Sequence, residues 1–435
     1  MTSAYQAQPR ATFFGCVLVG LWLTVVWGAL TPFDTKVSAT VCAWCAALAL
    51  WSATSPKVRL QIAVLMGVAF VGFALTPSPR EMSAFLDLVG NGVPLAAMLV
   101  AVSALQLLGD QLNLAGTRPR GAPALFRTFG GVTLFGAALN LSALVVAGDS
   151  IRRSGALTQF QSSALTQAFC TAVFFSPLIG GMALALTIIP DLEFLEVAIP
   201  GLALALLTWP AAVRLSTLRS AAEVDAFEGF PWRRDALKLP LVLALSIFAA
   251  ATMMPERSML TLLSVTTPAV VVAMLLWHQG LGATRSRLTE HVRSRLPAMA
   301  GEIWLFLAAG FMAASLTLAV QSDAAMIALD SFGPFEACIA MTITLVLSWL
   351  GLHPVVPMSA MVAISTPAST PPDLLAFTFV CSWGMGCVAN PLAAQVLTMQ
   401  ARYQMNAHEL ARSNRPFSLL LLALSSVMVF VWPSF

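Results

Sequence analysis

The sequence predicts an all-α polytopic membrane protein, and three observations lead to this fold class. The chain of 435 residues is 58% hydrophobic and only 10% charged. Soluble domains carry roughly 25% charged residues, so this composition excludes an ordinary soluble protein. The apolar residues gather in runs of about 20, the length at which a helix crosses a bilayer. Basic residues lie mostly between these runs.

The apolar runs follow one another along the chain as candidate spans. The first comes after a short polar lead without a small-residue cleavage site, so we expect a retained span and not a removed signal peptide. We expect transmembrane helices at 11–30, 37–53, 60–76, 88–108, 160–189, 192–213, 238–254, 259–279, 299–320, 372–401 and 416–434.

Two further apolar regions, 124–150 and 333–366, each carry an interruption in the middle. The first contains Asn140-Leu141-Ser142 and the second contains His353-Pro354. Proline breaks a helix because it removes a donor and clashes with the preceding turn. Each region is therefore either one interrupted crossing or two half-helices that enter and leave on the same side.

The distribution of basic residues distinguishes these two alternatives. If both regions are re-entrant, about eleven crossings place the N-terminus inside and the C-terminus outside. Of the 23 Lys and Arg residues, only Lys36, Arg80 and Arg257 then lie outside. The others lie on the cytoplasmic side, as the positive-inside rule requires. If only the first region crossed, most basic loops after it would lie outside. We therefore expect two re-entrant hairpins.

The same order of elements occurs twice, in opposite orientations. Each copy has a span, a hairpin, a span broken at a polar residue and proline, and a further span. The broken spans contain Ser176-Pro177 and Asn390-Pro391. This order indicates an inverted repeat, as in many transporters. The predicted organisation is N-terminal scaffold helices (1–84), repeat 1 (85–215), linking helices and cytoplasmic loops (216–297) and repeat 2 (298–435).

Helices that break within a membrane predict a binding site. Unpaired backbone groups in lipid cost several kcal/mol each, so such breaks persist only where protein or water covers them. The N-terminus of a half-helix presents N–H groups and a positive dipole end, which favour an anionic ligand. The two tips and the two breaks supply four such ends. Pro177 and Pro391 suit the first turn of a resumed helix.

Over residues 88–434 this arrangement resembles the ion-transporter superfamily, which includes divalent anion–sodium symporters, arsenite antiporters and the membrane subunits of TRAP transporters. The resemblance implies that a solute binds where hairpin tips meet broken helices. It also implies sodium or proton coupling, a homodimer and a moving transport domain. The symporters carry Ser-Asn-Thr at both tips, whereas this chain has "LNLSA" and "GLHPVV". The tip roles fall on Asn140 and Ser142, and on His353, Pro354 and Ser359.

Several of these polar residues have a structural interpretation beside the functional one. His353 either meets the solute or carries a proton, or caps the carbonyls of its own hairpin. Ser176 and Asn390 either contact the solute or serve as helix caps. Asp149 and Asp110 either couple ions or are interfacial carboxylates, and we weigh Glu302 in the same way. Polar residues of both broken spans line a path or join helices: Gln159, Gln161, Gln167, Thr166, Thr171, Ser382, Gln395 and Thr398.

The function predicted from the sequence is secondary transport of a small solute, more plausibly an anion than a cation, across a bacterial-type inner membrane. We expect no enzyme activity, no cofactor beyond a coupling ion, no nucleic-acid partner and no metal site. Cys42 and Cys45, in "CAWC", lack other ligands nearby. One alternative is a membrane enzyme acting on a lipid-linked substrate through His353, His278, His291 or His408. A passive channel is another, and a separate solute-binding protein is compatible with the chain.

Overall fold

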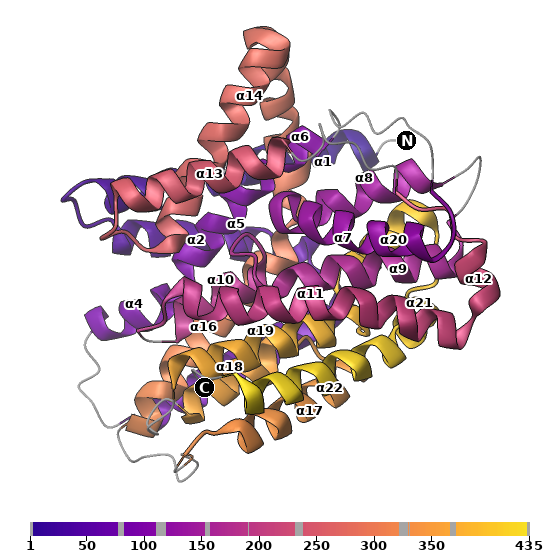
Figure 1. Cartoon of the computed structure of the whole chain (residues 1–435). Coiled ribbons are helices and arrows are strands. Elements are labelled where there is room, and N and C mark those ends of the chain that lie inside the picture. The colour runs from indigo at the N-terminus through magenta and orange to yellow at the C-terminus, as the bar shows by residue number, and fades with distance from the viewer. Residues whose placement is uncertain are drawn as a thin grey trace. The chain divides into compact units, whose positions relative to one another are not determined.

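A computed structural model shows that the protein is built almost entirely of helices, with one isolated bridge between Arg120 and Glu228 in the part that it describes (Figure 1). The predicted all-α class is therefore confirmed. The structure describes residues 3–76, 82–109, 119–152, 157–189, 191–230, 238–321, 329, 331–365 and 371–432. The chain forms two compact units, unit 1 (1–108, 245–328 and 362–367) and unit 2 (109–244, 329–361 and 368–435).

Unit 1 contains the helices that begin each half of the chain. They are α1 (Ser3–Leu30), α2 (Lys36–Ala49), α3 (Pro56–Leu75), α4 (Met82–Gly90), α5 (Val93–Ser103), most of α6 (Gln106–Gly109), α14 (Met259–Glu290), α15 (Leu296–Ala298) and α16 (Ala300–Gln321). A 3-10 turn (Trp51–Ala53) follows α2, and a π-helical turn (His291–Arg295) precedes α15.

Helix α5 forms the core of unit 1. Every residue of α5 except Pro94 is buried, and a helix that is apolar on all sides belongs inside a bundle or a membrane. It packs against α14 and α16. Gly310 of α16 lies so close to Gly92 that an added Cβ would come within 2.6 Å of the Gly92 backbone. The Asn91 amide donates to the Gly310 carbonyl at 3.1 Å. Small residues thus permit close helix contact, as is usual in membranes.

Unit 2 contains the interrupted helices. They are α7 (Gly121–Leu139), α8 (Leu141–Ile151), α9 (Gln159–Thr171) with a 3-10 turn (Ala172–Phe174), α10 (Gly180–Ile188), α11 (Phe194–Arg219), α12 (Ala221–Asp225), α17 (Pro334–Trp349), α19 (Pro372–Val388), α20 (Ala394–Tyr403), α21 (Ala407–Ser413) and α22 (Arg415–Val431). Two helices, α13 (Lys238–Met253) and α18 (Val355–Ser365), belong partly to each unit. All residues of α19 from Leu374 to Val388 are buried, so α19 is the core of unit 2.

Each of the eleven predicted spans coincides with a helix or a broken helix. By length and composition, seven helices among the described residues can cross a membrane, or eight if α21 and α22, bent by 43°, form one span. The seven are Thr12–Leu30, Pro56–Leu75, Met82–Leu108, Gly121–Leu139, Phe194–Arg219, Met259–Ala298 and Ala300–Val320. The chain is a multi-pass membrane protein. The count of eleven crossings and the inward N-terminus stay predictions.

The first interrupted region, 124–150, folds as two arms that reverse at Asn140. Asn140 has φ 52° and ψ −141°, which ends α7 and starts α8. Helix α7 runs alongside α9 in the same direction, because Thr133 donates to the Ala168 carbonyl and Ser176 donates to the Ala137 carbonyl. Helix α8 leads back to the start of α9, so α8 runs opposite to α7.

The second region, 333–366, is also interrupted at its predicted tip. Helix α17 ends at Trp349, Gly351 has φ 95°, and α18 begins at Val355. The Thr344 hydroxyl lies 3.1 Å from the Met358 sulfur. These two residues lie at similar separations from the tip, so the arms fold back on each other. Neither region is a continuous helix.

The two compact units do not follow the order of the chain, and the four sequential segments stay a prediction. The first span of each predicted repeat lies in unit 1, whereas the hairpins and broken helices lie in unit 2, apart from the last turn of α18. Each unit is thus assembled from both halves of the chain.

Candidate functional site

The two broken helices contain the same turn at their breaks. After Ser176, the Ser176 hydroxyl accepts from the Leu178 N–H at 3.2 Å and the Ile179 N–H donates to the Ser176 carbonyl. After Asn390, the Asn390 side-chain oxygen accepts from the Leu392 N–H at 2.8 Å and the Ala393 N–H donates to the Asn390 carbonyl. Serine and asparagine side chains bond readily to the backbone two residues on. Ser176 and Asn390 therefore close the turns before α10 and α20, and they are not the predicted helix caps, because the N-cap positions are occupied by Ile179 and Ala393.

The prolines at these breaks have a different place from the one predicted. Helix α10 begins at Gly180 and α20 begins at Ala394. Pro177 and Pro391 therefore lie in the turns and not in the first turns of the resumed helices. The prediction overlooked the side-chain bonds of Ser176 and Asn390, which form a turn before the helix resumes. Pro354 does lie directly before α18, next to Val355.

In each half, one asparagine joins the hairpin tip to the break of the neighbouring helix. The amide of Asn140, at the first tip, donates to the Leu178 carbonyl in the first break at 3.1 Å. The amide of Asn390, in the second break, donates to the Leu352 carbonyl at the second tip at 2.9 Å. The partners are 38 residues apart in both cases. These bonds satisfy carbonyls that would be costly to leave unpaired within a membrane.

The two broken helices cross close to their breaks. A Cβ on Gly384 of α19 would lie 2.5 Å from the Phe174 ring, and a Cβ on Gly181 of α10 would lie 2.7 Å from the Trp383 ring. The Trp383 ring in turn meets the His353 ring edge-on, with centroids 5.0 Å apart. Contacts therefore run without interruption from the first tip through both breaks to the second tip, all within unit 2.

His353 has one committed ring nitrogen and one that is available. Its Nδ1 atom accepts from the Val355 N–H at 3.2 Å, which caps the start of α18. A neutral imidazole that accepts at Nδ1 carries its proton at Nε2. That Nε2–H makes no hydrogen bond with any described residue. His353 thus caps a backbone N–H of its own hairpin, and not the carbonyls that were predicted, and it presents a donor at the tip.

Two hydroxyls near the tips also lack protein partners among the described residues. Ser142, in the first turn of α8, is 9% exposed and makes no hydrogen bond. Ser359, in α18, is fully buried and its hydroxyl has no partner. Buried polar atoms are normally bonded, and each exception requires an explanation. A polar solute or water would supply the missing partner.

The two acidic residues predicted for coupling have different outcomes. Asp149 lies near the end of α8 and pairs with Arg402 of α20, with the shortest N–O distance at 2.5 Å. Tyr403 also donates to Asp149, at 3.1 Å. Asp149 is therefore already neutralised by a basic partner. Asp110 lies outside the described residues.

The polar residues of the broken spans act mainly as contacts between helices. Gln159 donates to the Ser413 hydroxyl at 3.1 Å, and Gln167 donates to the Asn414 side chain at 2.9 Å. Gln395 donates to the Cys387 carbonyl at 2.7 Å. These bonds support the interpretation of helix-joining residues. Sequence reasoning missed Trp383. Its signal was a tryptophan followed by two closely spaced glycines in an apolar span, in "SWGMG".

The other three histidines of the enzyme alternative lie in different elements: His278 in α14, His291 in the π-helical turn and His408 in α21. His291 is 5% exposed and lies 2.8 Å from the Ser103 hydroxyl in unit 1, while His278 and His408 are exposed. Within the described ranges, no group of three or more His, Cys, Asp or Glu could hold a metal ion. Cys42 and Cys45 are free cysteines of α2.

Comparison with known proteins identifies a related fold. No protein-family model and no curated protein matches the sequence. Among solved structures, the YdaH transporter of Alcanivorax borkumensis, described as having an unusual topology, matches with a TM-score of 0.52 at 18% identity. The match covers 87% of this chain and 100% of that chain. The chain therefore shares the fold of a membrane transporter.

Proposed function

We propose that the protein is a secondary active transporter that moves a small anion by alternating access. The solute site consists of the two hairpin tips and the two helix breaks of unit 2. The observation that carries this proposal is the unbroken chain of contacts from Asn140 through Trp383 to His353. A protein that only needed rigid spans would have no reason to place four interruptions in contact.

The free polar atoms favour an anion as the solute. His353 offers an N–H donor at Nε2, and the Ser142 hydroxyl can donate as well. The starts of α8 and α18 add the positive ends of two helix dipoles. The carboxylate of the first hairpin, Asp149, is paired with Arg402 and so adds little negative potential.

The division into two units favours a moving transport body. Unit 2 holds both breaks and both tips, whereas unit 1 holds the helices that begin each half. Alternating access commonly moves one bundle against another around a fixed site. A sodium or proton gradient would drive the movement, in the inner membrane of a bacterial-type cell, and the working form would be a homodimer.

Uptake into proteoliposomes tests this function. Purified protein is reconstituted, a sodium gradient and a proton gradient are applied separately, and labelled organic and inorganic anions are screened. We expect uptake of at least one anion under one gradient, and its loss in His353→Ala and Asn390→Ala. Uptake that ignores both gradients would contradict active transport, and turnover of a lipid-linked substrate would favour the enzyme. Unchanged kinetics in both variants would remove the site assignment.

A further inference from the structure

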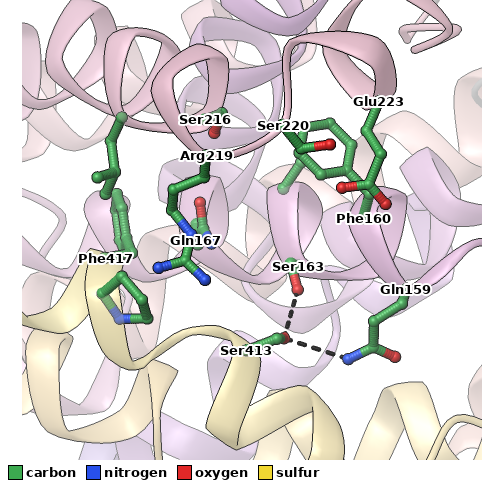
Figure 2. Close-up of a pocket in the computed structure, with 13 residues that line it drawn as sticks. Gln159, Phe160, Ser163, Gln167, Ser216, Arg219, Ser220, Glu223, Ser413 and Phe417 are labelled. Carbon is green, nitrogen blue, oxygen red and sulfur yellow. Dashed lines mark hydrogen bonds between the residues drawn. The ribbon is translucent and has the colours of Figure 1, made fainter.

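A polar pocket of about 140 Å³ lies in unit 2, away from the hairpin tips (Figure 2). Helices α9 and α11 and the junction of α21 and α22 form its walls. Hydrogen bonds join three of its lining residues. Ser163 and Ser413 share a hydrogen bond of 2.8 Å, and Gln159 donates to Ser413 at 3.1 Å. Phe160, Leu215 and Phe417 add apolar sides.

The two charged residues of the pocket are unpaired. Arg219 and Glu223 are four residues apart, a spacing that brings opposite charges together on a continuous helix. Here α11 ends at Arg219 and the backbone breaks at Ser220, with φ −157° and ψ 82°. Neither side chain has an ion-pair or hydrogen-bond partner among the described residues. Figure 2 shows the Arg219 guanidinium directed toward Gln167, while the Glu223 carboxylate lies beside Phe160.

The pocket therefore presents one positive and one negative group to the same small volume. A simple anion would be attracted by Arg219 but repelled by Glu223. A simple cation would be attracted by Glu223 but repelled by Arg219. A ligand with both charges a few bonds apart satisfies both side chains, through charge-assisted hydrogen bonds. The serine hydroxyls and glutamine oxygens complete a polar lining.

The position of the pocket along the chain indicates where such a ligand comes from. Arg219 is the last residue of α11, a helix long and apolar enough to cross a membrane. The end of such a helix lies at the depth of lipid headgroups. The apolar sides of the pocket suit the glycerol and first methylene groups of a lipid.

We propose that this pocket binds a phosphoethanolamine-type zwitterion, with its phosphate at Arg219 and its ammonium at Glu223. The chemistry is shared by the headgroup of phosphatidylethanolamine and by soluble phosphoethanolamine. This site is separate from the proposed transport site, so it stands whether or not the protein carries an anion.

Native mass spectrometry of the full-length protein in detergent tests the proposal. Phosphatidylethanolamine and phosphatidylglycerol are titrated separately, and soluble O-phosphoethanolamine is used as a competitor. We expect tighter binding of phosphatidylethanolamine and its displacement by O-phosphoethanolamine. Binding of O-phosphoethanolamine with no specific lipid binding would support the chemistry and assign a soluble ligand. Equal binding of the two lipids without competition would overturn the proposal.

Three variants locate the binding. Arg219→Gln should weaken phosphatidylethanolamine binding by about tenfold, the usual scale for one charge-assisted hydrogen bond. Glu223→Gln should weaken it too, and should strengthen phosphatidylglycerol binding because the repelling carboxylate is gone. Arg214→Gln is the matched control, since Arg214 is exposed on the same helix and does not line the pocket. An equal effect of Arg214→Gln and Arg219→Gln would show only general charge attraction and would refute the site.

Discussion

Asp149 and Arg402 form an ion pair that joins the first hairpin to the helix that follows the second break. Arg402 Nε and Nη2 lie 3.2 Å and 2.5 Å from Asp149 Oδ2. The single O–H of Tyr403 lies 2.8 Å from the Val145 carbonyl oxygen and 3.1 Å from Asp149 Oδ1, so these two acceptors share one donor. Burial and the nearby Asp149 charge raise the pKa of Tyr403, so Tyr403 keeps its donor at physiological pH. A predicted coupling residue thus takes part in a contact between the two halves of the chain.

Loss of this pair should lower stability modestly. Arg402→Gln is expected to cost about 1 kcal/mol, the scale of a partly exposed ion pair with good geometry. Thermal unfolding in detergent measures the change. The exchange Asp149→Arg with Arg402→Asp should recover part of the loss, whereas Arg412→Gln, an exposed neighbour, should have no effect. Equal midpoints for Arg402→Gln and the native protein would show that the pair contributes nothing.

The crossing of the broken helices should not tolerate an added methyl group. In Gly181→Ala the new Cβ would lie 2.7 Å from the Trp383 ring, which also contacts the His353 ring. Overpacking of this kind costs about 1–3 kcal/mol, and we also expect reduced uptake. Gly67→Ala is the control, because a Cβ there meets nothing within 4 Å. Equal unfolding temperatures for the two variants would contradict a steric limit at Gly181.

The two asparagines should respond alike to loss of their amide donors. Asn140→Asp and Asn390→Asp each keep the side-chain oxygen that accepts from the backbone, but lose the donor to Leu178 or Leu352. We expect each change to cost about 1–3 kcal/mol, because a partly buried carbonyl is left without its partner. Denaturant unfolding of both variants measures this. A large cost in one and none in the other would contradict equivalent roles.

Ser359 offers a test of solute contact that is independent of folding. Its buried hydroxyl has no protein partner, so Ser359→Ala should not destabilise the protein, because no hydrogen bond is lost. If the hydroxyl meets the solute, KM for uptake should rise while the folded fraction stays constant. Ser315→Ala is matched, since Ser315 is also fully buried and unpartnered but lies in unit 1. An unchanged KM would exclude Ser359 from the site.

Local chemistry explains which parts of the architecture could be predicted from the sequence. Asn140 and His353-Pro354 interrupt apolar runs, and an interruption in lipid has few structural solutions, so both tips lie where they were predicted. The starts of α10 and α20 were misplaced because the side-chain bonds of Ser176 and Asn390 extend each turn past its proline.

Contacts between distant segments were beyond reach from one sequence. Asp149 and Arg402 are 253 residues apart, and no periodicity links them. Arg219 and Glu223 line the same pocket because the backbone breaks at Ser220. The apolar pattern of the sequence does not predict this break. The same holds for Trp383, whose importance follows only from the crossing of α10 and α19.

The assembly of each unit from both halves has a consequence for biosynthesis. Helices α3 and α5 find their main partners in α16 and α14, which leave the ribosome much later. Domains generally fold as units during synthesis, and this one must wait until translation has passed residue 320. Until then the early helices stand in the bilayer without their partners, and a nascent chain truncated before α14 would be a substrate for quality-control proteases.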